Sequence, residues 1–157
     1  MPLTSVTKDA AKLTLTVVGD YTVPQQRLWD AFADARQLER FWGPPAWPAT
    51  FTRHDMRAGG RAEYFLSGPG GQTWNGSWKF TAVNPISSFE AQDGEDNAAD
   101  ETMPAAMKFT FEATPTGSRL TVVTAFSSIE AMEQTIPGME EGLRAAMPQL
   151  DALLAER

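Results

Sequence analysis

The sequence contains no cysteine and a single histidine, and both shortages limit the chemistry that the chain can perform. Without cysteine there is no disulfide framework, no thiol nucleophile and no zinc–cysteine site. A histidine-dependent nucleophile would have to use His54, and neither a G-x-S-x-G elbow nor a second histidine for a metal site accompanies it. The plainer interpretation of His54 is an exposed or hydrogen-bonded residue at the end of a strand. We therefore expect no metal, no cofactor and a binding protein rather than an enzyme.

Long apolar runs and basic clusters are also missing. No stretch approaches the roughly 20 apolar residues of a membrane span, and residues 1–11 lack the charged-then-apolar order of a signal peptide. The formal net charge is -7 and the pI is about 4.7, whereas binding to nucleic acid or to an anionic membrane requires clustered Lys and Arg. These features predict a cytoplasmic protein that binds neither nucleic acid nor membrane, with an acidity that serves solubility.

A chain of 157 residues is long enough for one well-buried domain. A globule of this size buries about 70% of its unfolded surface, so it needs no disulfide or metal to hold it together. No repeat or linker divides the sequence. We expect one domain over residues 1–157, present as a monomer or a homodimer.

The strongest pattern lies in residues 127–157. Apolar side chains recur there every three or four positions, which predicts a long amphipathic helix. The stripe consists of Met132, Ile136, Met139, Leu143, Met147, Leu150 and Leu154. Pro148 removes one backbone hydrogen bond within this helix, so we expect a bend there.

Most of the chain before this helix shows the alternation of β-strands. Seven strands are predicted, at residues 13–18, 47–54, 61–66, 73–83, 86–92, 107–112 and 119–126. Two short helices are predicted between the first two strands, one beginning at Pro24 and one at Ala35, and the second ends before Gly43. One helix cannot bury its apolar stripe alone. The economical arrangement is an α+β fold in which a curved antiparallel sheet wraps around the C-terminal helix.

Two loops have compositions that resemble ligand sites in part. The acidic residues of the loop at 93–101 mimic some positions of a calcium loop, but Ala98 stands where the sharp-turn glycine is needed. The glycine-rich segment at 68–71 lacks the lysine and the following helix of a phosphate loop. We interpret the first as a solvated tip and the second as a hairpin turn.

Aromatic and methionine side chains are abundant, with five Trp, nine Phe and seven Met. Such residues either pack an ordinary core or line a pocket. In the second case, the gap between sheet and helix would be lined by Trp42, Trp47, Tyr64, Trp78, Met107, Phe109, Met139 and Leu143. The polar residues available to orient a ligand would be Tyr64, Arg57, Glu63, Asn75 or Thr124.

Six short motifs occur in a family-specific order. They are Val23-Pro24 with Trp29, FWGP at 41–44, DMRAGG at 55–60, Gly76, VNP at 83–85 and GMEEG at 138–142. With these motifs, the chain from about Tyr21 to its end resembles the helix-grip fold of the START-like (SRPBCC) superfamily. Within that superfamily it is similar to the family related to the activator of Hsp90 ATPase. The resemblance implies a deep cavity without implying one reaction. Leu143 departs from the family pattern, because relatives commonly carry Trp at that position, and its smaller side chain would enlarge or reshape the cavity.

Three functions are compatible with this resemblance. The first is binding of a small hydrophobic or aromatic ligand in the cavity, and the second is a protein-interaction module of the co-chaperone kind with a protein partner. The third is a cyclase- or hydrolase-type enzyme, which would need an inward acid or base from Glu63, Asp55, Arg57 or His54. A continuous pocket of several hundred Å³ would favour the first function, and a filled interior would favour the second.

Overall fold

The computed structural model describes residues 3–42, 46–93, 106–126 and 128–155. Within these ranges the chain forms eight strands and three helices. The strands are β1 (Leu3–Asp9), β2 (Thr14–Tyr21), β3 (Ala49–His54), β4 (Arg61–Ser67), β5 (Thr73–Asn84), β6 (Ser88–Asp93), β7 (Ala106–Thr114) and β8 (Gly117–Ala125). The helices are α1 (Gln25–Ala33), α2 (Ala35–Trp42) and α3 (Ile129–Ala155).

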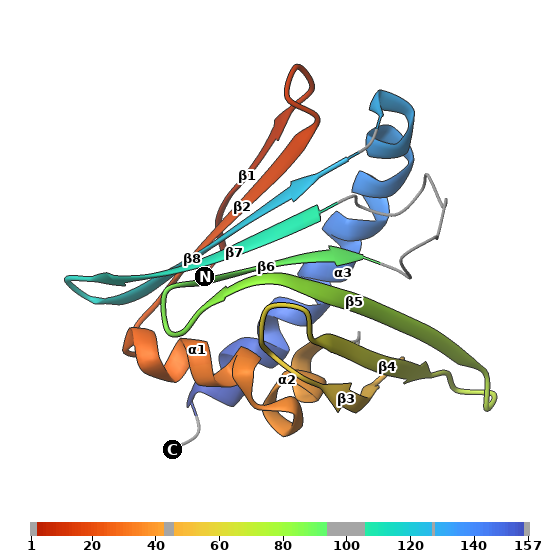
Figure 1. The fold of residues 1–157 in the computed structure, drawn as a ribbon, viewed down its shortest axis with the longest axis horizontal. Helices are drawn as coiled ribbons and strands as arrows, with labels where there is room; N and C mark the ends of the chain where they lie inside the picture. The colour runs from red at the N-terminus through yellow and green to blue at the C-terminus, as the bar shows by residue number, and fades with distance from the viewer. Residues whose placement is uncertain (1–2, 43–45, 94–105, 127, 156–157) are drawn as a thin grey trace.

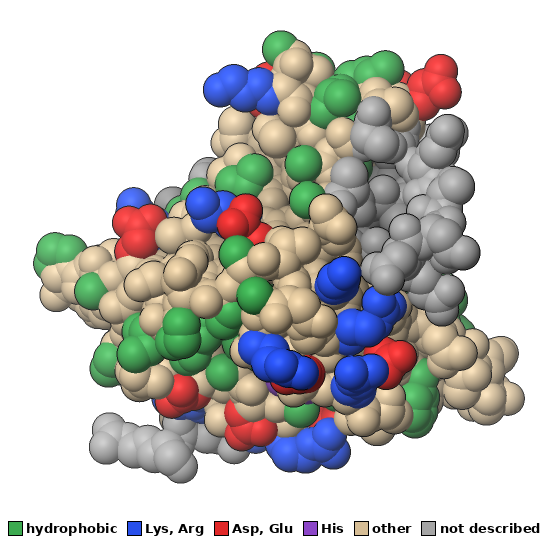
Figure 2. Space-filling model, viewed as in Figure 1, with side chains coloured by type: hydrophobic (Ala, Val, Ile, Leu, Met, Phe, Trp, Pro, Cys, Tyr) green, Lys and Arg blue, Asp and Glu red, His purple; other side chains and the backbone are tan. Residues whose placement is uncertain are grey.

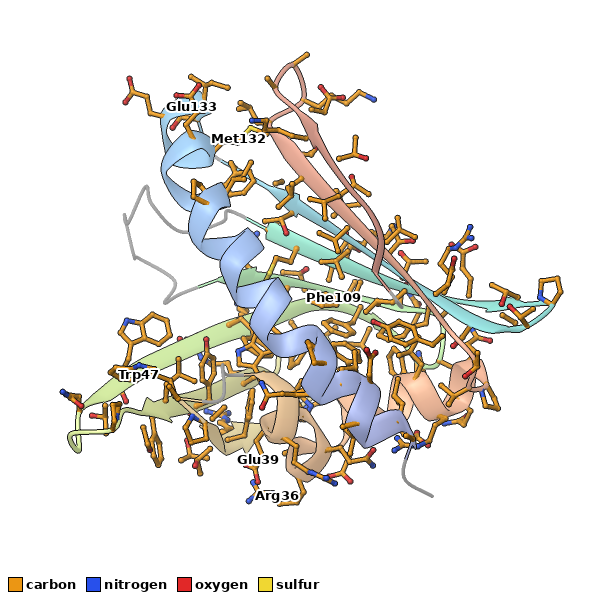
Figure 3. All side chains as sticks on the ribbon, turned by 180° about the vertical axis from the view of Figure 1, so that it is seen from behind. Arg36, Glu39, Trp47, Phe109, Met132 and Glu133 are labelled. Atoms are coloured by element: carbon orange, nitrogen blue, oxygen red, sulfur yellow. The ribbon has the colours of Figure 1, made fainter. Side chains whose placement is uncertain are left out.

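All eight strands form one antiparallel sheet in the order β1-β2-β8-β7-β6-β5-β4-β3. The sheet is curved and unclosed, with β1 and β3 at its edges (Figure 1). The long helix α3 crosses one face of this sheet, as the view from behind shows (Figure 3). The short helices α1 and α2 lie at one end, where α2 contacts both α3 and β3. The predicted α+β arrangement, a curved antiparallel sheet with a long C-terminal helix, is confirmed.

The predicted count of seven strands is wrong, because β1 precedes the first predicted strand. β1 is an edge strand that pairs with β2, and its sequence is mostly polar. Its one β-branched aliphatic residue, Val6, is 40% exposed. An edge strand with little buried surface lacks the alternation by which a strand is recognised in a sequence.

Two element boundaries also differ from the prediction. Residues 86 and 87 belong to a turn rather than to a strand, since Ile86 has a φ of 74° and the amide of Ser87 donates to the carbonyl of Asn84. Helix α3 covers 27 residues rather than about thirty. It stays helical through Pro137 and Pro148, and the bend expected at Pro148 remains a prediction.

Aromatic rings from α1, β6 and β7 form a central part of the main core. On β7 the alternation is clear, because Phe109 and Phe111 are buried while Lys108 and Glu112 are exposed. Phe89 of β6 stacks on Phe109, with ring centroids 4.5 Å apart and planes within 14°. Helix α1 covers these rings with the buried face Leu28, Trp29, Ala31 and Phe32. Burial of this apolar surface is the main stabilising term for the end of the sheet near α1.

Helix α3 contributes to two separate apolar clusters. Near its start, Met132 and Ile136 pack with Leu15 and Val17 of β2 and with Phe126. Near its end, three buried leucines join the main aromatic core; they are Leu150, Leu153 and Leu154. The helix therefore anchors at both ends of the sheet. Of the predicted stripe, the side chains of Met139, Leu143 and Met147 lie outside the described residues.

Candidate functional site

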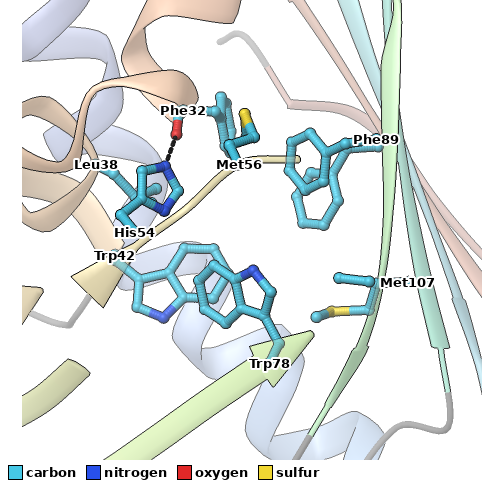
Figure 4. A pocket seen from close by; sticks show the side chains of 10 residues that line it. Phe32, Leu38, Trp42, His54, Met56, Trp78, Phe89 and Met107 are labelled. Atoms are coloured by element: carbon cyan, nitrogen blue, oxygen red, sulfur yellow. Dashed lines mark hydrogen bonds between the residues drawn. The ribbon is translucent and has the colours of Figure 1, made fainter. Parts of the chain in front are cut away.

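An apolar pocket lies between the sheet and the short helices (Figure 4). Its described lining consists of Phe32, Leu38, Trp42, His54, Met56, Trp78, Phe89, Ala91, Met107 and Phe109. These residues come from α1, α2, β3, β5, β6, β7 and the loop after β3. The cavity has a volume of about 10 Å³, which is the space of one water molecule.

One wall of the pocket is built from Trp42 and Trp78. Their ring centroids are 4.9 Å apart. Tyr64 of β4 packs beside both of them, and its ring centroid lies 6.2 Å from that of Trp42 and 5.6 Å from that of Trp78. This arrangement explains Gly76, which is paired with Tyr64 across β4 and β5. A Cβ at position 76 would overlap the Tyr64 ring, so only glycine leaves room for it.

His54 is fixed by a hydrogen bond to helix α1. Its Nε2 lies 2.9 Å from the carbonyl oxygen of Phe32, which can only accept, so Nε2 carries the proton. Burial lowers the pKa of His54, and this effect outweighs the hydrogen bond to Phe32 and the charges of Asp34 and Asp55, which act in the opposite direction. The imidazole is therefore neutral near pH 7, and its Nδ1 presents a lone pair.

Two buried polar side-chain atoms in the described part of the chain have no hydrogen-bond partner. They are Nδ1 of His54 and Nε1 of Trp78. Both residues line the pocket, and Trp78 is only 4% exposed. Because buried polar atoms are nearly always paired, two such atoms in one apolar pocket indicate a site with unmet hydrogen-bonding capacity.

The other acids and bases considered from the sequence lie away from this pocket. Asp55 pairs with Arg57 at 2.8 Å, and the Arg57 side chain is largely exposed. Glu63 faces Arg53 at 3.8 Å, with about half of each side chain exposed. His54 is therefore the one candidate acid or base among the described lining residues.

The structure brings together part of the predicted pocket. Trp42, Trp78, Met107 and Phe109 line it. Tyr64 packs behind the tryptophans instead of lining the cavity. Met139 and Leu143 belong to α3, but their side chains lie outside the described residues.

Trp47 does not belong to the described pocket lining. It packs instead under the hairpin between β4 and β5, where a Cβ on Gly68 would come within 2.5 Å of Trp47 Cη2. The polar side chains proposed to orient a ligand, namely Tyr64, Arg57, Glu63, Asn75 and Thr124, are likewise absent from the described lining. The two unpaired polar atoms belong to His54 and Trp78. From the sequence, His54 was predicted as an exposed or hydrogen-bonded residue or as a candidate acid or base, and Trp78 only as part of the apolar lining.

Five further lining residues were not predicted from the sequence, namely Phe32, Leu38, Met56, Phe89 and Ala91. The apolar faces of the two short helices can be recognised in the sequence. The pattern of β6, however, does not show which residues of other elements its side chains contact. A stronger signal was available at His54. A lone histidine at the inner end of an apolar strand pattern needs a partner, and helix ends supply free carbonyls.

No group of three or more His, Cys, Asp or Glu side chains is arranged to hold a metal ion in the described part of the chain. The acidic loop considered for calcium falls almost entirely on residues 94–105, which lie outside that part. None of the described helices is both long and apolar enough to cross a membrane.

Comparisons with known proteins place the chain in a family. The family model described as activator of Hsp90 ATPase homolog 1-like protein matches residues 22–155. No curated protein matches the chain. The crystal structure of protein Ms6760 from Mycobacterium smegmatis is 42% identical, covers 98% of each chain and superposes with a TM-score of 0.85.

A solution structure of a protein from Arthrobacter aurescens is 37% identical, covers 98% of this chain and 92% of that one, and gives a TM-score of 0.87. A Rhodobacter sphaeroides protein shares the fold at 17% identity, with a TM-score of 0.84 over 96% of this chain and 97% of that one. The family match spans the two short helices, the sheet from β3 onward and helix α3. The chain therefore belongs to the family of activator of Hsp90 ATPase homolog 1-like proteins.

Proposed function

We propose that this protein binds a small, mostly apolar ligand without catalysis, in the pocket between the sheet and the helices. The observation that carries this proposal is the composition of the pocket. Aromatic rings, methionines and small aliphatic side chains form its walls, and two polar atoms in those walls are not used by the fold. Apolar walls with a few placed polar groups are the usual composition of small-molecule sites.

A ligand larger than water needs more room than the cavity of about 10 Å³ provides. The lining supplies a means of opening, because Met56 and Met107 are only partly buried and the methionine side chain has three rotatable bonds. Trp42, also partly buried, packs against Trp78 on another side of the pocket (Figure 4). Rotation of these side chains toward solvent would enlarge the pocket while leaving the strands in place.

The direct test is a titration of isotope-labelled protein with p-xylene, followed through the indole Nε1–H resonances of its tryptophans. We expect the Trp78 resonance to shift on binding. Trp74 provides an internal control, because it lies on the same strand but is 46% exposed and is not among the described lining residues. A Trp78 resonance that does not move at probe saturation would reject the pocket as an apolar ligand site.

A mass spectrum of the native protein purified from its own host would add the identity of the ligand. A retained small molecule of constant mass supports the proposal. Protein that carries no small molecule, together with no response to p-xylene, would contradict it.

A second function, a protein-interaction module, is favoured by the small volume of the cavity. An interior that is nearly filled is what such a module requires, and the name of the family refers to an activator of a chaperone ATPase. The hairpin of β4 and β5 also presents Trp74 of β5, which is 46% exposed. If p-xylene leaves Trp78 unchanged, this alternative gains support. An enzyme of the cyclase or hydrolase type would have to use His54, and nothing in the described pocket supplies a second acid or base for it.

A further inference from the structure

We propose that the ligand of this pocket is a phenol or a cyclic alcohol whose hydroxyl group accepts a hydrogen bond from Trp78 Nε1 and donates one to His54 Nδ1. This inference rests on the proposed binding function and specifies the chemistry of the ligand. Figure 4 shows the His54 ring and the Trp78 indole on two sides of the same pocket.

The His54 side of the site is an acceptor. The Nε2 proton is directed at the carbonyl oxygen of Phe32, 2.9 Å away, and this bond fixes both the ring orientation and the tautomer. Nδ1 then has a lone pair, no proton and no partner in the protein. A ligand atom that meets Nδ1 must therefore bring a hydrogen.

The Trp78 side is a donor. The indole Nε1–H can donate and cannot accept. The side chains around this indole are aromatic: Trp42 at 4.9 Å, Tyr64 at 5.6 Å and Phe51 at 5.7 Å between ring centroids. These neighbours pack against the indole without satisfying Nε1. A ligand atom that meets Nε1 must therefore offer a lone pair.

A hydroxyl group is the smallest chemical group that satisfies both atoms. A carboxylate brings no hydrogen and would bury a charge, and no Lys or Arg is among the described lining residues to compensate it. An ammonium group brings no lone pair. A primary amide has two donor hydrogens and a carbonyl oxygen on separate atoms, so two wall atoms would leave part of it unpaired. The closed cavity of about 10 Å³ is bounded by apolar surface, so the hydroxyl reaches the two nitrogens once Met56, Met107 or Trp42 has rotated aside.

In the opened pocket the same two nitrogens would also suit one water molecule, which needs two to four polar partners. A ligand hydroxyl that takes the position of such a water keeps both hydrogen bonds, whereas a methyl group at that position loses them. The apolar walls then contact the ring that carries the hydroxyl. The site thus discriminates between two ligands of one shape that differ only in this group.

The test compares p-cresol with p-xylene, which have nearly the same shape and differ by a hydroxyl in place of a methyl group. We expect wild-type protein to bind p-cresol about tenfold to a hundredfold more tightly, since a buried polar group left unpaired loses about that factor. The measured quantity is the ratio of the two dissociation constants within one variant, so that changes in pocket volume cancel.

Two variants locate the preference. Trp78→Phe removes the donor and keeps an aromatic ring, and His54→Gln places an amide nitrogen near the position of Nε2, where it can still donate to Phe32, while it deletes Nδ1. Each should reduce the ratio severalfold. Trp74→Phe is the matched control at an exposed tryptophan and should leave the ratio unchanged.

The outcomes separate the two proposals. If neither probe binds, the binding function fails and the hydroxyl assignment fails with it. If both probes bind with equal affinity, the binding function stands and the hydroxyl assignment is wrong, which means that the polar atoms hold only water. A p-cresol preference that survives in both His54→Gln and Trp78→Phe would also overturn the assignment, because it would place the hydroxyl elsewhere.

Discussion

His54 Nε2 donates a hydrogen bond of 2.9 Å to the carbonyl oxygen of Phe32, and this bond joins the end of β3 to the last turn of α1. The last four carbonyls of a helix have no partner within that helix. A side chain from the sheet satisfies one of them here. The bond holds the only histidine of the chain in a partly buried position, and burial lowers its pKa by more than the bond raises it. The imidazole is therefore neutral, and the stability of the fold is connected to pH.

The stability of the protein should fall as the pH decreases from 7.5 to 5.5. The folded pKa of His54 lies below its ordinary value of 6.5, so in this range the unfolded chain binds the proton first. The contribution of His54 to the free energy of unfolding is therefore fully present above pH 6.5 and is lost as the pH falls toward the folded pKa. The slope is at most about 1.4 kcal/mol per pH unit. Denaturant unfolding at several pH values measures this slope.

His54→Gln is the control for this pH dependence, because it removes the only imidazole while retaining a donor for Phe32. The variant should have a flatter profile between pH 7.5 and 5.5. Equal slopes in wild type and variant would show that His54 does not control acid sensitivity. Burial raises the pKa of Asp151 above its ordinary value of 3.8, and this shift has the opposite effect, because its contribution to stability decreases as the pH rises.

Gly60→Ala should destabilise the protein more than Gly59→Ala, although Gly59 has the left-handed backbone, with a φ of 85°. A Cβ at Gly59 meets no described atom within 4 Å, so the cost is the backbone strain of about 1 kcal/mol. A Cβ at Gly60 overlaps the carbonyl oxygen of Asp55, which the backbone must move to relieve. We expect a loss of about 2–3 kcal/mol in denaturant unfolding.

Movement at Gly60 would also disturb its pairing with β5, since its carbonyl oxygen accepts from the amide of Phe80 at 2.9 Å. Hydrogen exchange at Phe80 should accelerate in Gly60→Ala. A variant of Gly60 as stable as wild type would mean that the loop relaxes without cost.

Gln25→Ala should destabilise the fold by about 1–2 kcal/mol. The Gln25 side-chain amide donates to two backbone carbonyls from distant parts of the chain, Phe111 at 2.7 Å and Ile86 at 3.1 Å. Its removal leaves the partly buried Phe111 oxygen without this donor. Thermal or denaturant unfolding measures the loss.

The neighbouring Gln26→Ala is the matched control for this substitution. Gln26 makes a single exposed hydrogen bond, to Asp30 within the same helix. Its removal should change stability by less than about 0.5 kcal/mol. Equal losses in the two variants would indicate a general effect on α1 instead of the loss of the two long-range hydrogen bonds.

Leu143→Trp should abolish uptake of apolar probes at little cost in stability if the space beside α3 belongs to the ligand site. The larger ring then occupies a void. In a solid core the same change would overpack the interior and cost about 1–3 kcal/mol. Probe titration and the denaturant midpoint of this variant separate the two cases.

Glu133→Trp adds the same side chain at an exposed position of α3 and provides the comparison. It should alter neither measurement. Unchanged probe binding in Leu143→Trp would exclude that position from the site.

The fold was predictable where one face of an element is buried. β7 shows this best, because its Phe residues alternate with polar residues. Only one face of this strand can therefore point toward the core, and a shift by one residue would expose every Phe. β1 was missed since it buries too little to be marked by alternation. The turn at Ile86 was assigned to a strand because a β-branched residue rarely adopts a positive φ, and a tertiary contact from Gln25 holds it there.

The pocket was only partly predictable, for a related reason. A sequence shows that Trp42 and Trp78 are apolar and large, but the polar atom of an indole matters only once its neighbours are known. The same limit applies to His54, whose partner Phe32 lies 22 residues earlier on another element. Long-range pairs of this kind are fixed by packing and leave no local pattern.

The strand order also dictates when the sheet can be completed. β2 has β8 as its second neighbour, with Thr14 opposite Ala125, so more than a hundred residues separate the two partners. During synthesis, β1 and β2 leave the ribosome before β8. An isolated two-stranded hairpin is only marginally stable in water. Leu15 and Val17 are buried in the folded protein, but they stay exposed to solvent until β8 and the start of α3 have been made. The first strands of this sheet to be made are thus among the last to be covered, and their apolar side chains are open to aggregation during that interval.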